Sequence, residues 1–150
     1  MAIAEFISGD RAFWRHPFFF VFISMGFWDA CLFLPSLEIA HQSVPNTGGS
    51  YLMIGWIGPV GGNFEWYANP ALVLSAYFLL KRWWPASMAS AIIALALISI
   101  LFFTRSMLAD EGGARSVVTA FLIGYWLWVA SAITLLIGAI VQMLQPRTVT

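Results

Sequence analysis

Apolar residues along this chain gather in four long runs, which are separated by short stretches rich in polar residues, glycine and proline. A membrane-spanning helix needs about 20 residues, because each residue adds about 1.5 Å and the hydrocarbon layer is about 30 Å thick. The four runs therefore predict an all-helical membrane protein with a single domain over residues 1–150. The expected spans are residues 18–37, 64–83, 86–105 and 117–144.

The second apolar run is too long for one straight span and is interrupted by the sequence GGNFEWYANP at residues 61–70. As a single helix, residues 51–80 would be about 45 Å long. Proline lacks a backbone N–H, and it disfavours helical geometry in the residue before it. The pair Asn69-Pro70 therefore predicts a break within this run.

Two arrangements of the second run are open. In the favoured one, a helix over residues 64–83 is kinked at Pro70, and residues 51–62 lie in the outer membrane interface. In the other, residues 51–60 enter the membrane as a re-entrant half-helix. Irregular backbone at that depth is tolerated only when protein buries it or when it lines a cavity.

Composition supports the membrane interpretation, since 61% of the residues are hydrophobic and only 9% are charged. Soluble domains carry about 25% charged residues. Cytoplasmic loops of membrane proteins are enriched in lysine and arginine. With the N-terminus in the cytoplasm, five of the seven basic residues lie on that side, which predicts that both termini are cytoplasmic. The five are Arg11, Arg15, Lys81, Arg82 and Arg147, and the two outside are Arg105 and Arg115.

The chain lacks the sequence patterns of several protein classes. Its net charge is zero and it has no basic run, so we expect no nucleic-acid partner. The single cysteine, Cys31, excludes an internal disulfide and is expected to be a small core residue. No HExxH, GxSxG, P-loop or CxxC pattern occurs, and His16 and His41 are predicted on opposite sides of the membrane. We therefore expect no catalytic residues, no metal site and no cofactor.

Asp29 is the most unusual charge, because it lies about 17 Å into the first predicted span when counted from Phe18. A carboxylate at that depth costs a few kcal/mol. It is expected to face the bundle interior, to be protonated or to find a donor. It is then a proton or cation site, a contact to another subunit, or a structural hydrogen bond to a neighbouring helix.

Glu65 lies about 24 Å from Lys81 along the second predicted span, near the outer boundary. Arg105, at the outer end of the third span, is a possible ion-pair partner. Glu65 is therefore either half of a structural pair or part of a ligand or ion site. Its position is wetter than that of Asp29, which leaves Asp29 as the stronger functional candidate.

Two further groups of residues are candidates for binding. Asp110 and Glu111, in the outer loop ADEGG, could attract a cation or a basic patch of a partner, although a solvated turn explains them as well. A divalent site needs more oxygen ligands than this loop supplies. Aromatic side chains in two segments suit either packing or a platform for a lipid, quinone or pigment. They are Trp66, Tyr67, Tyr125, Trp126 and Trp128.

Three sequence elements together resemble those of a loose group of small four-helix bacterial inner-membrane proteins of unassigned function. The elements are Trp66-x-Ala68-Asn69-Pro70 before a span, the loop Glu111-Gly112-Gly113, and the aromatic last helix around residues 124–131. The resemblance implies a location in the bacterial inner membrane. It implies no activity.

Three functions follow as hypotheses. The leading one is a non-enzymatic interaction protein, either an accessory subunit or an immunity-type binder of another membrane protein, because aromatic residues suit interfaces and no catalytic set is present. Self-association is included in that hypothesis. The second is a small proton or ion pathway that uses Asp29 and Glu65. The third is the binding of a lipid, quinone or pigment by the aromatic last helix.

Overall fold

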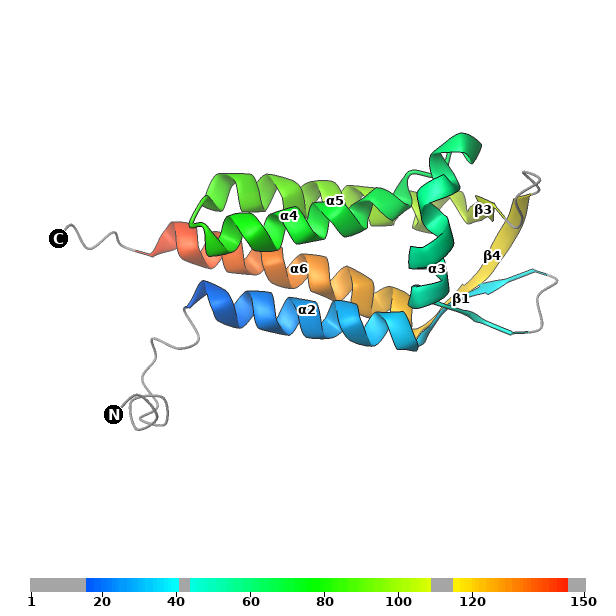
Figure 1. Ribbon diagram of the computed structural model, residues 1–150, viewed down its shortest axis with the longest axis horizontal. Coiled ribbons are helices and arrows are strands. Elements are labelled where there is room, and N and C mark those ends of the chain that lie inside the picture. Colours follow the sequence, from blue (N-terminus) through cyan, green and yellow to red (C-terminus); the bar gives the residue numbers. More distant parts are fainter. Residues whose placement is uncertain (1–15, 41–43, 109–114, 146–150) are drawn as a thin grey trace.

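The chain is described here from a computed structural model, which covers residues 16–40, 44–108 and 115–145. Four helices lie side by side and alternate in direction, so that the start of α2 and the end of α6 are at the same end of the bundle (Figure 1). They are α2 (Pro17–Phe33), α4 (Ala68–Leu80), α5 (Trp84–Thr104) and α6 (Ile123–Leu144). Each of the four expected spans overlaps one of these helices, and the chain is mostly helical as expected. Among the described helices, α5 and α6 are long and apolar enough to cross a membrane.

A small antiparallel sheet covers the other end of the bundle, where loops and the ends of two helical spans were expected (Figure 1). Its strand order is β2-β1-β4-β3. The strands are β1 (Pro35–Ile39), β2 (Asn46–Thr47), β3 (Ser106–Leu108) and β4 (Arg115–Phe121). The expectation of an all-helical chain is therefore wrong at this end.

The sheet forms because two apolar runs are longer than the helices within them, and the remaining residues of each run become a strand. Pro35 pushes Leu34 into an extended conformation, with ψ 151°, which ends α2 at Phe33 instead of residue 37. At the start of the fourth run, β4 precedes α6. Since the backbone groups of both segments need partners, β1 pairs with β4 and its Leu37 lies opposite Phe121.

The bundle is packed through small side chains. Buried positions on α5 are three and four residues apart, which is the spacing of a coiled-coil seam. They are Ser87, Ala91, Ala94, Ile98 and Leu101. The Ser75 hydroxyl donates to the Ser87 carbonyl and the Ser87 hydroxyl to the Ser75 carbonyl, both at 2.9 Å, which joins α4 to α5. The Ser24 hydroxyl donates to the Ser131 carbonyl at 2.8 Å and joins α2 to α6.

The second apolar run is divided into several elements instead of one kinked helix. Helix α3 (Gly48–Ile54) crosses the end of the bundle beside the sheet (Figure 1). Two 3-10 helices follow it, η2 (Gly55–Gly61) and η3 (Glu65–Tyr67), and then α4 begins at Ala68. Pro70 thus lies in the first turn of α4, where its missing N–H does little harm, and the predicted mid-helix kink is wrong.

Candidate functional site

A buried carboxylate lies at the end of the bundle that the sheet covers. The Glu65 side chain is only 1% exposed. The Tyr51 hydroxyl donates to its Oε1 at 2.9 Å, and Asn63 Nδ2 donates to the same oxygen at 2.8 Å. Asn63 Nδ2 also donates to the Ser106 carbonyl at 3.0 Å. The network therefore ties α3 and the η2–η3 connection to β3.

A glycine-rich turn brings Asn63 to this position. Gly62 has φ 77°, a left-handed conformation that residues with a Cβ rarely adopt. The Asn63 N–H donates to the Gly58 carbonyl at 2.9 Å, and a Cβ on Gly58 would lie 2.6 Å from the Asn63 carbonyl oxygen. The turn therefore depends on glycine at both positions. It presents the Asn63 amide to Glu65, only two residues along the chain.

Two oxygens of this network have no hydrogen-bond partner among the described residues. They are Glu65 Oε2 and Asn63 Oδ1, and both are buried. The ion pair of Glu65 with Arg105 that was considered from the sequence is not formed. Arg105 ends α5 with φ 48°, and its guanidinium carbon lies 5.9 Å from the centre of the Phe121 ring. Glu65 therefore has two donors on one oxygen, and none of the cationic side chains that the structure describes lies beside it.

Tyr51 remains a hydrogen-bond donor in this environment. Burial, followed by the negative charge of Glu65 and the hydrogen bond to it, raises the pKa of the Tyr51 hydroxyl well above its usual value of 10.0. The phenol is therefore protonated at physiological pH. Tyr51 and Asn63 were not recognised from the sequence, because neither lies in a periodic pattern. The only local signal was the cluster of glycines that precedes Asn63.

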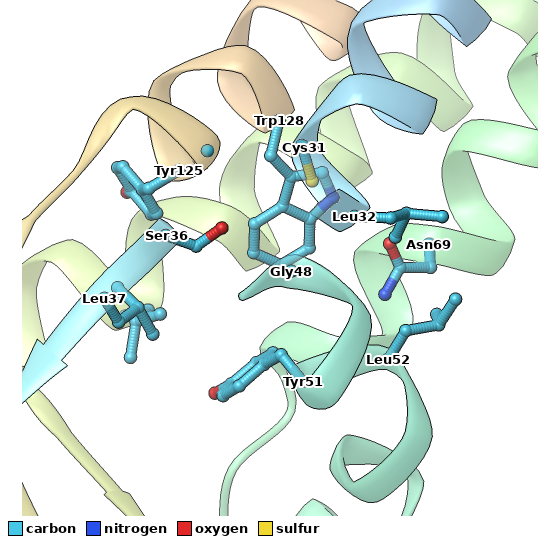
Figure 2. A pocket seen from close by; sticks show the side chains of 12 residues that line it. Cys31, Leu32, Ser36, Leu37, Gly48, Tyr51, Leu52, Asn69, Tyr125 and Trp128 are labelled. Carbon is cyan, nitrogen blue, oxygen red and sulfur yellow. The ribbon is translucent and has the colours of Figure 1, made fainter. Parts of the chain in front are cut away.

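A small cavity lies under the start of α3, between the end of α2 and the start of α6 (Figure 2). Its volume is about 20 Å³, enough for one water molecule. Trp128 lines this cavity, and its indole N–H is buried without a partner among the described residues. Tyr51, Asn69, Tyr125 and Cys31 also line it. Cys31 is buried, which confirms it as a core residue. The cavity has room for a water-sized group and no room for a quinone or a pigment ring.

The Asn-Pro pair has a structural explanation at the side of this cavity. In a helix, the Trp66 carbonyl would accept from the N–H of residue 70, but Pro70 has none. Asn69 Nδ2 donates to that carbonyl instead, at 3.0 Å. Asn69 Oδ1 accepts from the Trp28 indole N–H at 3.0 Å, which links α4 to α2. Asn69 thus compensates for Pro70 and joins two helices.

Replacing Asn69 by leucine should lower the free energy of unfolding by about 1 kcal/mol, because the partly buried Trp28 indole N–H loses its acceptor. Trp28→Phe should then cost less in the N69L protein than in the wild type, since it removes the orphaned donor. Chemical denaturation of the four proteins of this double-mutant cycle measures the coupling. If the two substitutions change the free energy of unfolding additively, the hydrogen bond between Trp28 and Asn69 does not contribute to stability.

Asp29 does not face the bundle interior, which corrects the first expectation for this residue. It is exposed on the outer surface of α2. The inward positions of α2 are Pro17, Ser24 and Cys31, seven residues apart. Because almost every residue of α2 is apolar, the sequence pattern did not identify its buried face.

The remaining candidates do not gather in one place. Trp66 donates to the Leu52 carbonyl at 2.9 Å, while Tyr125 and Trp128 are buried. Tyr67 and Trp126 are 44% and 50% exposed, so the five aromatic residues form no common platform. Asp110 and Glu111 lie outside the described residues. No group of three or more His, Cys, Asp or Glu side chains that could hold a metal occurs within the described ranges.

No protein family, curated protein or solved structure matches this chain.

Proposed function

We propose that this chain is an integral membrane protein with four spans that acts without catalysis, by binding a transmembrane helix of another membrane protein along the outer face of α2. The observation that carries the proposal is the exposed Asp29 on an apolar helix, one turn before that helix ends at Phe33. The proposal takes up the leading one of the three hypotheses from the sequence and adds to it a surface and a partner chemistry.

Helix lengths support four spans. Helices α5 and α6 have 21 and 22 residues, which is about 32 Å each. Helix α2 has 17 residues, about 26 Å, and η3 together with α4 reaches about the same length. Short helices of this kind are accommodated by local thinning of the bilayer. Large apolar side chains on outward faces suit contact with lipid, such as Phe103 at 80% and Ile93 at 54% exposed.

The outer face of α2 has the spacing of a helix-packing seam. Its exposed residues recur at intervals of four, four, three and four positions. They are Phe18, Phe22, Gly26, Asp29 and Phe33, named here the α2 stripe. No heavy atom of a neighbouring element lies within 4 Å of the position of a Cβ on Gly26. A glycine on an open face allows another helix to approach closely in a membrane.

The charge of Asp29 indicates which kind of partner helix would fit the α2 stripe. An unpaired carboxylate facing lipid costs a few kcal/mol, and a basic side chain at the same depth would remove that cost. Helices α2, α4, α5 and α6 contain no lysine or arginine. A symmetric pair of copies of this chain would place one Asp29 against another. Charge complementarity therefore favours a different protein, whose helix carries Lys or Arg opposite Asp29.

The geometry favours this function over an ion pathway. Asp29 is on the outer surface of α2, whereas Glu65 is buried at the sheet end of the bundle. One acid is thus exposed and the other buried, and no hydrogen bond joins the two side chains.

Photocrosslinking in the native membrane tests the proposal. A benzophenone amino acid at Phe22, on the α2 stripe, should form one discrete adduct with a second protein, and Asp29→Asn should reduce its yield about tenfold. The same probe at Ile93, which is 54% exposed on α5, is the matched control and should not form this adduct. Mass spectrometry should place the crosslink in a transmembrane helix that contains Lys or Arg.

Exchange of the charges gives the decisive result. Asp29→Lys should abolish the adduct, and replacement of the partner's basic residue by Asp should restore it. An adduct between two copies of this chain, an adduct that Asp29→Asn leaves unchanged, or adducts with lipid alone would each overturn the proposal.

A further inference from the structure

We propose that Glu65 and Asn63 form a binding site for a monovalent metal cation, of the size of sodium or potassium, at the sheet-covered end of the bundle. This inference is independent of the partner proposed for the α2 stripe, because the two sites share no residue. It also departs from the expectation of no metal site. That expectation considered only motifs that bind transition metals or divalent cations.

The first argument is the uncompensated charge. Glu65 is 1% exposed, and the groups that contact its carboxylate are two neutral donors, the Tyr51 hydroxyl and the Asn63 amide. Removing a carboxylate from water costs several kcal/mol unless a positive charge is close by. None of the side chains that the structure describes forms an ion pair with it, so a bound cation would neutralise it directly.

The second argument is the pair of free oxygens. Both donors are bonded to Glu65 Oε1, which leaves Oε2 without a partner, and Asn63 Oδ1 is unpartnered as well. Asn63 is 8% exposed, so neither oxygen reaches bulk water. The orientation of the Asn63 amide is fixed by its Nδ2, which donates to both Glu65 and the Ser106 carbonyl. Two buried acceptors thus remain available on side chains that are themselves hydrogen bonded at 2.8 Å.

The kind of cation follows from these acceptors. A bound metal ion would neutralise the charge and could accept lone pairs from both oxygens. Carboxylate and amide oxygens are hard ligands, which alkali and alkaline-earth ions prefer. With one carboxylate and no cluster of three acidic, His or Cys ligands in the described residues, the site balances a single positive charge. A monovalent ion therefore fits it best.

Thermal unfolding of the full-length protein in detergent tests the site. Midpoints are compared in equal concentrations of NaCl, KCl and choline chloride at one pH, so that only the identity of the cation changes. A tenfold excess of a bound ion over its dissociation constant should raise the midpoint by about 4 °C relative to choline, because the ion binds only the folded state. Glu65→Gln keeps the shape of the side chain, and it should make the midpoints in the three salts equal.

Two further measurements complete the test. Asp29→Asn removes an exposed acid elsewhere in the bundle and should retain the full sodium or potassium effect. Equilibrium dialysis with radioactive sodium or rubidium should show stoichiometric binding to the wild type that Glu65→Gln abolishes. Equal midpoints of the wild type in all three salts would overturn the proposal and indicate a protonated Glu65. An ion effect that persists in Glu65→Gln would overturn it as well.

Discussion

Replacement of Gly138 by leucine is expected to separate α2 from α6 and to lower the thermal unfolding midpoint by about 10 °C. A Cβ on Gly138 would lie 2.7 Å from Cβ and Cγ of Phe20, and 3.1 Å from a methyl carbon of Leu79. Three helices meet at this point, so the added side chain has no direction in which to move. Overpacking at such a site costs about 3 kcal/mol, a large fraction of the stability of a small protein. Differential scanning fluorimetry in detergent measures the shift.

Gly26→Leu is the matched control, since it adds the same side chain to a glycine that has no heavy atom of a neighbouring element within 4 Å. Its midpoint should stay within about 2 °C of the wild type. The same variant should weaken the crosslink from Phe22, because it fills the open position of the α2 stripe. If Gly138→Leu and Gly26→Leu unfold at the same temperature, α2 and α6 do not pack closely at Gly138 and Phe20.

Replacement of Gly48 by valine is expected to lift α3 from the end of α2 and to expose Cys31. A Cβ on Gly48 would contact the Cys31 carbonyl oxygen and would lie 2.8 Å from its Sγ. Because the first of these contacts is to backbone, no rotamer change relieves it. A local cost of about 3 kcal/mol corresponds to an increase of about 100-fold in the rate at which a maleimide labels Cys31. Mass spectrometry of samples quenched over time measures that rate.

Met53→Ala is the matched control for this experiment, because Met53 is on the same helix and is 75% exposed. It should leave the labelling rate of Cys31 unchanged. Since Tyr51 of α3 donates to Glu65, Gly48→Val should also remove the difference between sodium and choline in thermal unfolding. If Cys31 is labelled no faster in Gly48→Val than in the wild type, α3 does not control access to this thiol.

The difference between the expected and observed roles of Asp29 and Glu65 has a physical cause. The sequence placed Asp29 at mid-depth, and its high cost there suggested a buried site. The side of a helix that a residue occupies is readable only when polar and apolar residues alternate with the helical period. In α2 the flanking residues are apolar on every side, so only packing against α6 determined that Ser24 is buried and Asp29 is exposed.

The sheet was missed for a related reason. Its central pairing joins β1 to β4, and Leu37 is opposite Phe121, more than half the chain away. Local sequence patterns report neighbours along the chain, whereas this pairing exists only after the bundle has brought the two segments to the same end. The Glu65 network depends on the same assembly, because Ser106 of β3 holds the Asn63 amide that donates to Glu65.

By itself, the sequence determined the four helices, the break before α4 and the scarcity of charge, because hydrophobic run length and proline chemistry act locally. It also identified Asn69 and Pro70 as a special pair. The tertiary structure alone decided which acid is buried, which face of α2 is open and where strands replace loops and the ends of helices. Those features depend on contacts between segments far apart in the chain. Where such segments meet, small residues such as Gly48 and Gly138 determine how closely the helices approach.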